Sequence, residues 1–200
     1  MRSEVVIIDL AASVAIIRGG QVLLTKRSDV EAWTLPGGRV ESGESVVQAA
    51  IREAQEETGF QVQLTRLVGI YYLPEWKYGS NHEVLFAAKP IGGTLRPQPS
   101  EVAEEAFFDP QDLPSPLLWW QRQRIHDAMS GIGGSVVWMQ RATWPFKGEE
   151  LHERLSETDA SKEEFLARHF SMPAHDVPAD LEVLLVGGAE SGDDICPSSY

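Results

Sequence analysis

Residues 38–60 read GRVESGESVVQAAIREAQEETGF and carry the start and stop signals of one amphipathic helix. Ser45 is a good N-cap residue, and Gln48 three positions later completes a capping box. Gly59 supplies the left-handed residue at which a helix ends. Four apolar residues repeat at helical spacing and are predicted to form one stripe against a core: Val47, Ala50, Ile51 and Ala54.

The other side of this helix is predicted to carry three carboxylates, because Glu53, Glu56 and Glu57 follow the i, i+3, i+4 rule. They fall in the last two turns, where the helix dipole disfavours negative charge. A hard divalent cation would relieve this repulsion, since Mg²⁺ prefers carboxylate oxygens, retained waters and substrate phosphates. A solvated acidic face is the alternative. The glycine-rich lead-in at residues 37–43 favours the metal site, because it indicates a shaped loop whose backbone approaches something closely.

This stretch resembles the Nudix box, G-x5-E-x7-R-E-U-x-E-E-x-G-U, in which U is a bulky apolar residue. The matching positions are Gly38, Glu44, Arg52, Glu53, Glu56, Glu57, Gly59 and Phe60. Ala54 departs from the pattern, since the family prefers Ile, Leu or Val there; this weakens packing behind the helix but removes no ligand. The resemblance covers roughly the first two thirds of the chain. It implies an α/β (α+β) fold, a Nudix-like α/β/α sandwich with a mixed central sheet, here followed by a C-terminal extension.

The resemblance also implies roles for the residues of the box. Glu53 and Glu57 are the expected metal ligands, and Glu56 is either a third ligand or the general base. Arg52 joins the catalytic set as the residue that orients these glutamates through salt bridges. Glu44 is expected to brace the loop. The expected cofactor is Mg²⁺, with Mn²⁺ as the alternative.

The predicted substrate-binding residues are Gly37, Gly38, Arg27, Tyr72 and Trp76. The two glycines would let backbone groups come close to the metal or the phosphates. Lys26 and Arg27 stand at a strand end, where Nudix-like chains often place a basic residue near the phosphates. Either residue could take this role, and a solvated strand end is the alternative. The two aromatic residues could stack a base, although aromatic residues in a β-rich domain are more often part of the core.

Residues 97–105 are predicted to form a polar loop that carries Glu101, Glu104 and Glu105. The loop and the short strand predicted after it, at residues 106–108, resemble the Nudix segment that often brings a further glutamate to the metals. Glu101 is the predicted residue, and Glu104 is the alternative. An ordinary exposed acidic loop is the simpler interpretation. The predicted catalytic set is therefore Glu56, Glu101 and Arg52.

A divalent ion on such a carboxylate cluster neutralises phosphate oxygens and activates water. The resemblance therefore implies a magnesium-dependent pyrophosphohydrolase acting on a nucleoside diphosphate linked to another moiety. Pro74 resembles a mark of the ADP-ribose subgroup, and Tyr78 one of the dinucleoside polyphosphate subgroup. ADP-ribose or a related nucleotide is the first expectation, and a dinucleoside polyphosphate or a (d)NTP is the alternative. A non-catalytic nucleotide-sensing module is the alternative of another class, but such modules usually lose these acids.

Composition narrows the class of partner. The net charge of −13 argues against a nucleic acid polymer, which needs clustered Lys and Arg. Cys196 is the only cysteine, so no disulfide forms within the chain. The apolar N-terminal run is broken by Asp9 and lacks a basic start, which indicates strands rather than a signal peptide. No apolar run reaches membrane-spanning length, so we expect a soluble, cytoplasmic protein.

A glycine-rich break at residues 131–134 follows a helix predicted at residues 116–130. It sets the predicted organisation: a Nudix domain over residues 1–133, an accessory extension over 134–187 and a disordered acidic tail over 188–200. Ser161 and Glu164 form a second capping box, which predicts a helix to about residue 169. Residues 134–200 have a net charge of −8 and no recognisable chemistry. Packing against the main domain or against a second subunit in a homodimer is expected.

Overall fold

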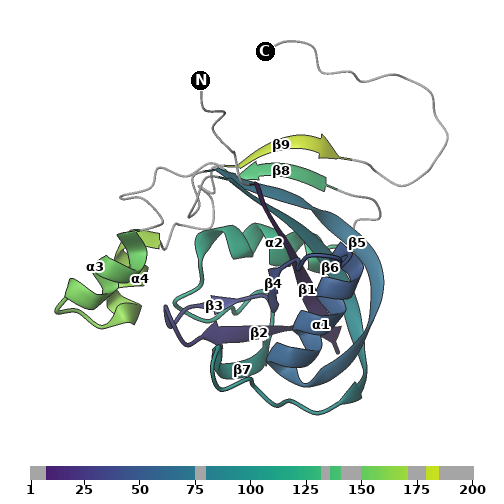
Figure 1. The fold of residues 1–200 in the computed structure, drawn as a ribbon, viewed down its shortest axis with the longest axis horizontal. Coiled ribbons are helices and arrows are strands. Elements are labelled where there is room, and N and C mark those ends of the chain that lie inside the picture. The colour runs from purple at the N-terminus through teal and green to yellow at the C-terminus, as the bar shows by residue number, and fades with distance from the viewer. Residues whose placement is uncertain (1–7, 75–79, 132–135, 141–149, 171–178, 185–200) are drawn as a thin grey trace, which may run out of the picture.

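The computed structural model describes residues 8–74, 80–131, 136–140, 150–170 and 179–184 (Figure 1). The strands are β1 (Ile8–Arg18), β2 (Gln21–Arg27), β3 (Trp33–Thr34), β4 (Gly37–Arg39), β5 (Phe60–Pro74), β6 (Ser80–Gly93), β7 (Val102–Phe108), β8 (Val136–Gln140) and β9 (Ala179–Leu184). The helices are α1 (Val46–Thr58), α2 (Trp119–Met129), α3 (Leu151–Glu157) and α4 (Lys162–Phe170).

The strands form a mixed sheet in the order β3-β2-β1-β6-β5-β8-β9, with β4 paired to β1 and β7 paired to β2. β1 and β6 are parallel, β6 and β5 are antiparallel, and β5 and β8 are again parallel. Alternate residues of β1 face opposite sides: Val14 and Ile16 belong to the core under α1, whereas Ala15 belongs to the core under α2. The two helices therefore cover opposite faces of the sheet, which confirms the predicted α/β/α sandwich (Figure 1).

Both predicted ends of α1 are present. The hydroxyl of Ser45 accepts a hydrogen bond from the Gln48 backbone N–H at 3.2 Å, and the Gln48 side chain accepts one from the Ser45 N–H at 2.8 Å. Gly59 has a φ of 71°, the left-handed conformation expected of the residue that ends the helix. These caps fix the register of the helix, and with it the position of each glutamate.

The predicted apolar stripe of α1 was partly wrong. Val47 and Ile51 are 43% and 39% exposed, whereas the buried side chains include Ala49, Ala50 and Ala54. Three alanines on the buried face let the helix axis lie close to the sheet, and larger residues there would hold it away. The helix is therefore rotated from the predicted orientation, and the buried face also includes Glu53.

β7 begins at Val102, so the predicted loop at residues 97–105 ends earlier than expected. Glu104 and Glu105 lie on this strand, opposite Lys26 and Thr25 of β2. The polar composition of residues 102–105 predicted a loop, but their pairing with β2 makes them the first part of strand β7.

The chain beyond residue 131 contributes to the same architecture. β8 pairs with β5, and β9 pairs with β8, so these strands extend the main sheet. α4 begins at the predicted capping box, where the Glu164 backbone N–H donates to the Ser161 hydroxyl at 3.1 Å. α3 was not predicted, because one short helix carries too little periodicity to be recognised. The boundary at residues 133–134 stays a prediction, and the tail predicted at 188–200 lies outside the described residues.

None of the helices within the described ranges is long and apolar enough to span a membrane.

Candidate active site

Two adjoining cavities lie between the start of β1, the glycines of β4 and the C-terminal half of α1. The smaller cavity, of about 300 Å³, is lined by Glu53, Glu57 and Glu101 among others. The larger cavity has a volume of about 610 Å³ and extends to the N-terminal end of α2. Six residues line both cavities: Arg27, Thr34, Gly37, Gly38, Arg39 and Glu101. The two cavities are therefore neighbouring parts of one site.

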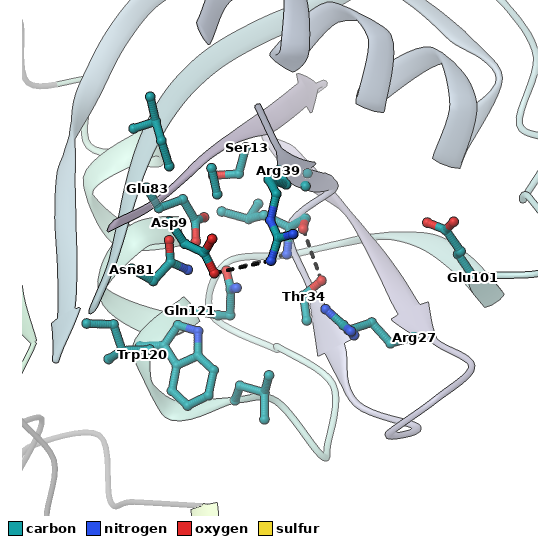
Figure 2. Close-up of a pocket in the computed structure, with 17 residues that line it drawn as sticks. Asp9, Ser13, Arg27, Thr34, Arg39, Asn81, Glu83, Glu101, Trp120 and Gln121 are labelled. Atoms are coloured by element: carbon teal, nitrogen blue, oxygen red, sulfur yellow. Dashed lines mark hydrogen bonds and ion pairs between the residues drawn. The ribbon is translucent and has the colours of Figure 1, made fainter. Parts of the chain in front are cut away.

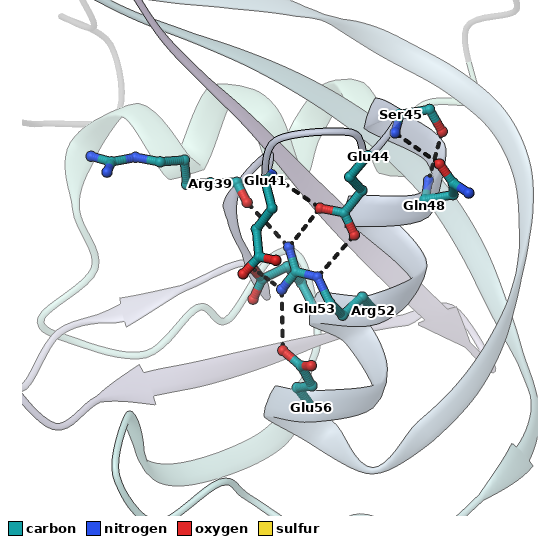
Figure 3. Close-up of polar contacts among 8 residues, drawn as sticks. All are labelled: Arg39, Glu41, Glu44, Ser45, Gln48, Arg52, Glu53 and Glu56. Carbon is teal, nitrogen blue, oxygen red and sulfur yellow. Dashed lines mark hydrogen bonds and ion pairs between the residues drawn. The ribbon is translucent and has the colours of Figure 1, made fainter.

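Arg52 holds the acids of the box together (Figure 3). Its Nε and Nη2 donate to the two oxygens of Glu44 at 2.9 Å each, and Nη1 donates to Glu53 at 2.7 Å and to Glu56 at 3.1 Å. Nη2 also donates to the backbone carbonyl of Arg39 at 3.1 Å. An arginine side chain has five N–H donors, and these contacts use all of them. Arg52 therefore orients the acids and has no donor left for a substrate.

The same contacts shift the pKa values of both partners. The hydrogen bonds from Arg52 lower the pKa of Glu44 below its usual range, and those acids raise the pKa of the Arg52 guanidinium. Glu44 thereby links the loop before α1 to the middle of the helix. This is the bracing role that the resemblance implied for it.

Glu53 is buried against the backbone of Gly38. A Cβ atom built on Gly38 would overlap the Glu53 carboxylate, with the carboxylate carbon at only 2.7 Å. Burial raises the pKa of Glu53, and the neighbouring Glu56 and Glu101 add to the rise, while Arg52 opposes it. Any side chain at position 38 would displace this carboxylate.

Glu57 is anchored to β4 by the backbone N–H of Gly37, which donates to its Oε2 at 3.0 Å. Burial, reinforced by the charges of Glu53 and Glu101, raises the pKa of Glu57 to about 8. Arg27 lies close enough to oppose this shift. However, the Arg27 guanidinium donates to both oxygens of Asp29, at 2.9 and 2.6 Å, so it does not neutralise Glu57 directly.

Glu101 reaches both cavities from the loop before β7, and its charge raises the pKa of Glu53 and of Glu57. Glu104, the alternative, instead pairs with Lys26 at 3.1 Å, and its side chain is 60% exposed. Glu104 lines neither of the two cavities. The structure therefore brings Glu101, and not Glu104, to the acids of α1.

Glu56 lies at the rim. Its exposed side chain contacts Arg52 through Oε2 and lines neither cavity, although its charge acts on Glu53. Tyr72 also lies outside both linings; its ring stacks on His82, with ring centroids 4.7 Å apart. Trp76 is outside the described residues.

The larger cavity contains polar residues that the sequence did not single out (Figure 2). Asp9 and Asn81 are direct partners on the parallel strands β1 and β6, and Ala11 faces Glu83 two residues further along. Because side chains alternate along a strand, Asp9, Asn81 and Glu83 share one face. The sequence held one signal for this group of residues, namely polar side chains at alternate positions of otherwise apolar strands. Only the pairing of β1 with β6 brings Asp9 next to Asn81 and Glu83.

Several polar groups at the larger cavity could accept a hydrogen bond from a ligand. Ser13 Oγ and Asn81 Oδ1 are buried and have no hydrogen-bond partner among the described residues. Arg124, which is 1% exposed, donates to Glu83 Oε2 at 2.6 Å. Glu83 lines the cavity, and its Oε1 is an acceptor that this bond from Arg124 does not use. Trp120 and Gln121, at the start of α2, close the same end of the cavity (Figure 2).

The donor set fits a hard divalent cation. Glu53, Glu57 and Glu101 supply only oxygen ligands, and their mutual repulsion is of the kind that a cation relieves. Within the described part of the chain, no group of three or more acidic, His or Cys side chains is already arranged around a single point. Waters and substrate phosphates would complete the coordination, as Mg²⁺ usually requires.

Comparisons with known proteins give a family match and several similar proteins. The sequence profile of a family described as "NUDIX domain" matches residues 8–128. A Bacillus subtilis (strain 168) protein, named provisionally as an 8-oxo-dGTP diphosphatase, is 37% identical over 111 residues, which cover 56% of this chain and 72% of that protein. An ADP-ribose pyrophosphatase from Methanocaldococcus jannaschii is 35% identical over 121 residues, covering 58% of this chain and 70% of its own.

A solved structure is also similar. The crystal structure of a MutT NUDIX hydrolase from Burkholderia pseudomallei superposes with a TM-score of 0.56 and 27% sequence identity. The match covers 60% of this chain and 97% of that one. The matched profile ends at residue 128, so α3 and α4 lie beyond it.

Proposed function

Because this chain belongs to the NUDIX family of hydrolases, enzymes that act on acid anhydrides, we propose that it cleaves a nucleotide phosphoanhydride at Glu53, Glu57 and Glu101. The observation that carries this assignment is that the three carboxylates line one cavity. Two come from α1, and the third comes from a loop more than forty residues further along the chain. A surface of ordinary acidic residues would separate these charges.

Glu53 and Glu57 would hold a divalent metal ion, Mg²⁺ or Mn²⁺, and Glu56 would join them from the rim through its Oε1, which Arg52 does not use. Such an ion neutralises phosphate oxygens and lowers the pKa of a bound water. Arg52 keeps the Glu53 carboxylate in place, and the Gly37 N–H does the same for Glu57. Glu101, which lines the same cavity, would accept the proton of the attacking water.

The nucleoside part of the substrate would occupy the larger cavity. The residues common to both cavities let one molecule extend from the carboxylates toward Asn81 and Trp120. Arg27 and Arg39 lie along this path and would accompany the phosphates. Both are held by acids: Arg27 by Asp29, and Arg39 by Asp9 at 3.2 Å. Because these acids neutralise both arginines, the arginines would not repel a metal cation bound nearby.

One observation favours a guanine-type base in a nucleoside triphosphate over the adenine of ADP-ribose. The inner end of the larger cavity offers acceptors, Asn81 Oδ1 and the Glu83 carboxylate, on adjacent positions of one strand face. Guanine presents neighbouring N–H donors on its pairing edge, whereas adenine presents one amino group beside a ring-nitrogen acceptor. A Glu83 oxygen that faces this nitrogen would meet a second acceptor instead of a donor, which costs about 1–3 kcal/mol. ADP-ribose therefore becomes the second candidate.

The test is a substrate panel with the full-length protein and Mg²⁺: dGTP, 8-oxo-dGTP, dATP, ADP-ribose and diadenosine tetraphosphate. We expect the guanine-type triphosphates to be cleaved with a kcat/KM at least about tenfold above that of dATP. Chelation with EDTA should abolish cleavage, and added Mg²⁺ should restore it. Equal rates for all bases would contradict the base assignment, and an absence of metal-dependent cleavage across the panel would contradict the proposed function.

A further inference from the structure

The helix pair α3–α4 packs against residues that line the larger cavity. One buried cluster combines Leu155, Phe165 and Leu166 of these helices with Leu73, Leu118 and Trp120 of the main domain. The last three also line the larger cavity. Leu73, Leu118 and Trp120 therefore belong both to the buried cluster that the helix pair joins and to the lining of the larger cavity. Figure 1 shows the pair beside the β2–β3 end of the sheet.

A second connection joins the helix pair to the turn between β2 and β3. Lys162 Nζ lies 3.3 Å from Glu31 Oε1, and Val30 and Ala32 of the turn belong to the same buried cluster. Glu31 has a φ of 58°, an uncommon backbone conformation for a residue other than glycine, so its neighbours must hold it in place. The turn follows directly after Arg27, which lines both cavities.

We propose that α3 and α4 are a positioning element for the nucleoside: Phe165 and Leu155 hold Trp120 as the wall of the larger cavity and so determine nucleotide affinity. This inference rests on the proposed function. It concerns residues outside the part of the chain that the family profile matches. Among the described residues, neither helix contributes a side chain to the lining of the smaller cavity. His152 on α3 approaches that lining, with its Nε2 lying 3.9 Å from Oδ2 of Asp29. We therefore expect the hydrolytic step to depend little on the helix pair.

Phe165→Ala is the principal test, and Phe86→Ala is its matched control. Both phenylalanines are buried, at 9% and 8% exposure, but Phe86 packs under α1 and lines neither cavity. We expect Phe165→Ala to raise both the Kd and the KM for dGTP about tenfold, with kcat within about twofold of wild type. Phe86→Ala should lower the melting temperature to a similar extent without changing the Kd. Phe165→Leu, which keeps most of the apolar volume, should restore binding.

A double-mutant cycle with Trp120→Ala tests whether Phe165 affects nucleotide binding through Trp120. If Phe165 acts through Trp120, then Phe165→Ala will weaken binding little further once Trp120 is absent. Additive losses, or equal Kd values for Phe165→Ala and Phe86→Ala, would overturn the inference. Leu155→Ala, at a buried site on α3, takes the place of Phe165→Ala if that variant does not fold, with the same expected result.

The Kd is measured by calorimetry with Mg²⁺ and a dGTP analogue that cannot be hydrolysed, so it does not depend on turnover and the acids do not repel the phosphates. A wild-type protein that binds dGTP but does not cleave it would refute the proposed function and leave the positioning role standing. A wild type that binds no nucleotide would refute both.

Discussion

The backbone N–H of Gly37 donates to Oε2 of Glu57 across 3.0 Å and so ties strand β4 to the last turn of α1. The two residues are twenty positions apart. A Cβ on Gly37 would lie 2.6 Å from the Cα of Ser13 on β1, so only glycine lets β4 come this close to the sheet. Close packing of β4 thus positions the donor that orients one proposed metal ligand, and Gly38 makes room for the other.

Glu57→Gln tests the metal site. The substitution keeps the shape of the side chain and its acceptor for Gly37, but it removes the charge that a divalent ion needs. We expect turnover to fall by about two orders of magnitude or more. The metal-free melting temperature should not fall, because burial raises the pKa of Glu57 to about 8 and its charge does not stabilise the metal-free fold. In wild type, Mg²⁺ should raise the melting temperature by mass action, and this rise should disappear in the variant. A variant with near-wild-type turnover would refute the assignment.

Glu101→Gln and Glu104→Gln distinguish the predicted base from its alternative. Glu101 faces the cavity, whereas Glu104 pairs with Lys26 on the surface. We expect Glu101→Gln to lower kcat about 100-fold or more with little change in KM, because a general base acts mainly in the transition state. Glu104→Gln should stay within about twofold, since exposed ion pairs contribute little. Equal and mild effects would make the loop an ordinary surface loop.

Arg52→Lys examines the network that holds the acids. A lysine keeps the charge but cannot reproduce the paired contacts to Glu44 together with those to Glu53 and Glu56. We expect kcat/KM to fall at least about tenfold and the melting temperature to drop, by about 2–4 °C for each kcal/mol lost. Arg154→Lys is the control, because Arg154 forms an exposed pair with Glu150 on α3. Equal effects of the two substitutions would contradict the orienting role.

Glu105 predicts a pH dependence of stability. Its Oε2 is buried and has no hydrogen-bond partner in the part of the chain that the structure describes, and burial raises the pKa of Glu105 to about 7. A raised pKa means that the folded state binds the proton more tightly than the unfolded chain. The resulting stabilisation is complete below the usual glutamate pKa, near 4.5, and is lost as the pH rises through about 7.

Glu105→Gln should therefore melt close to wild type at pH 5 and several degrees higher at pH 8.5, about 2–4 °C for each kcal/mol. Calorimetric or fluorescence melting curves at the two pH values measure this difference. Glu104→Gln is the control on the same strand, because the Glu104 side chain is 60% exposed. If the difference in melting temperature between Glu105→Gln and wild type is the same at pH 8.5 as at pH 5, Glu105 does not have the raised pKa that its burial predicts.

The sequence by itself determined helix α1, its caps and the order of its glutamates. These depend on residues within a few positions of one another, and a hydrogen bond between Ser45 and Gln48 needs no distant partner. The spacing of the residues within 38–60 also gave the resemblance to the Nudix box, and this resemblance predicted the sandwich fold. It did not reveal which face of α1 is buried. That depends on how closely three alanines let the helix approach a sheet that is formed elsewhere in the chain.

Only the tertiary structure decided which acids and amides share a cavity. Asp9 and Asn81 meet because β1 and β6 pair in parallel in one register, and a shift by one residue would turn either side chain to the opposite face. Trp120, which lines the larger cavity, and Phe165, forty-five residues later, belong to one buried cluster. Such contacts depend on strand register and on the packing of distant helices, and no local pattern in the sequence encodes either of them.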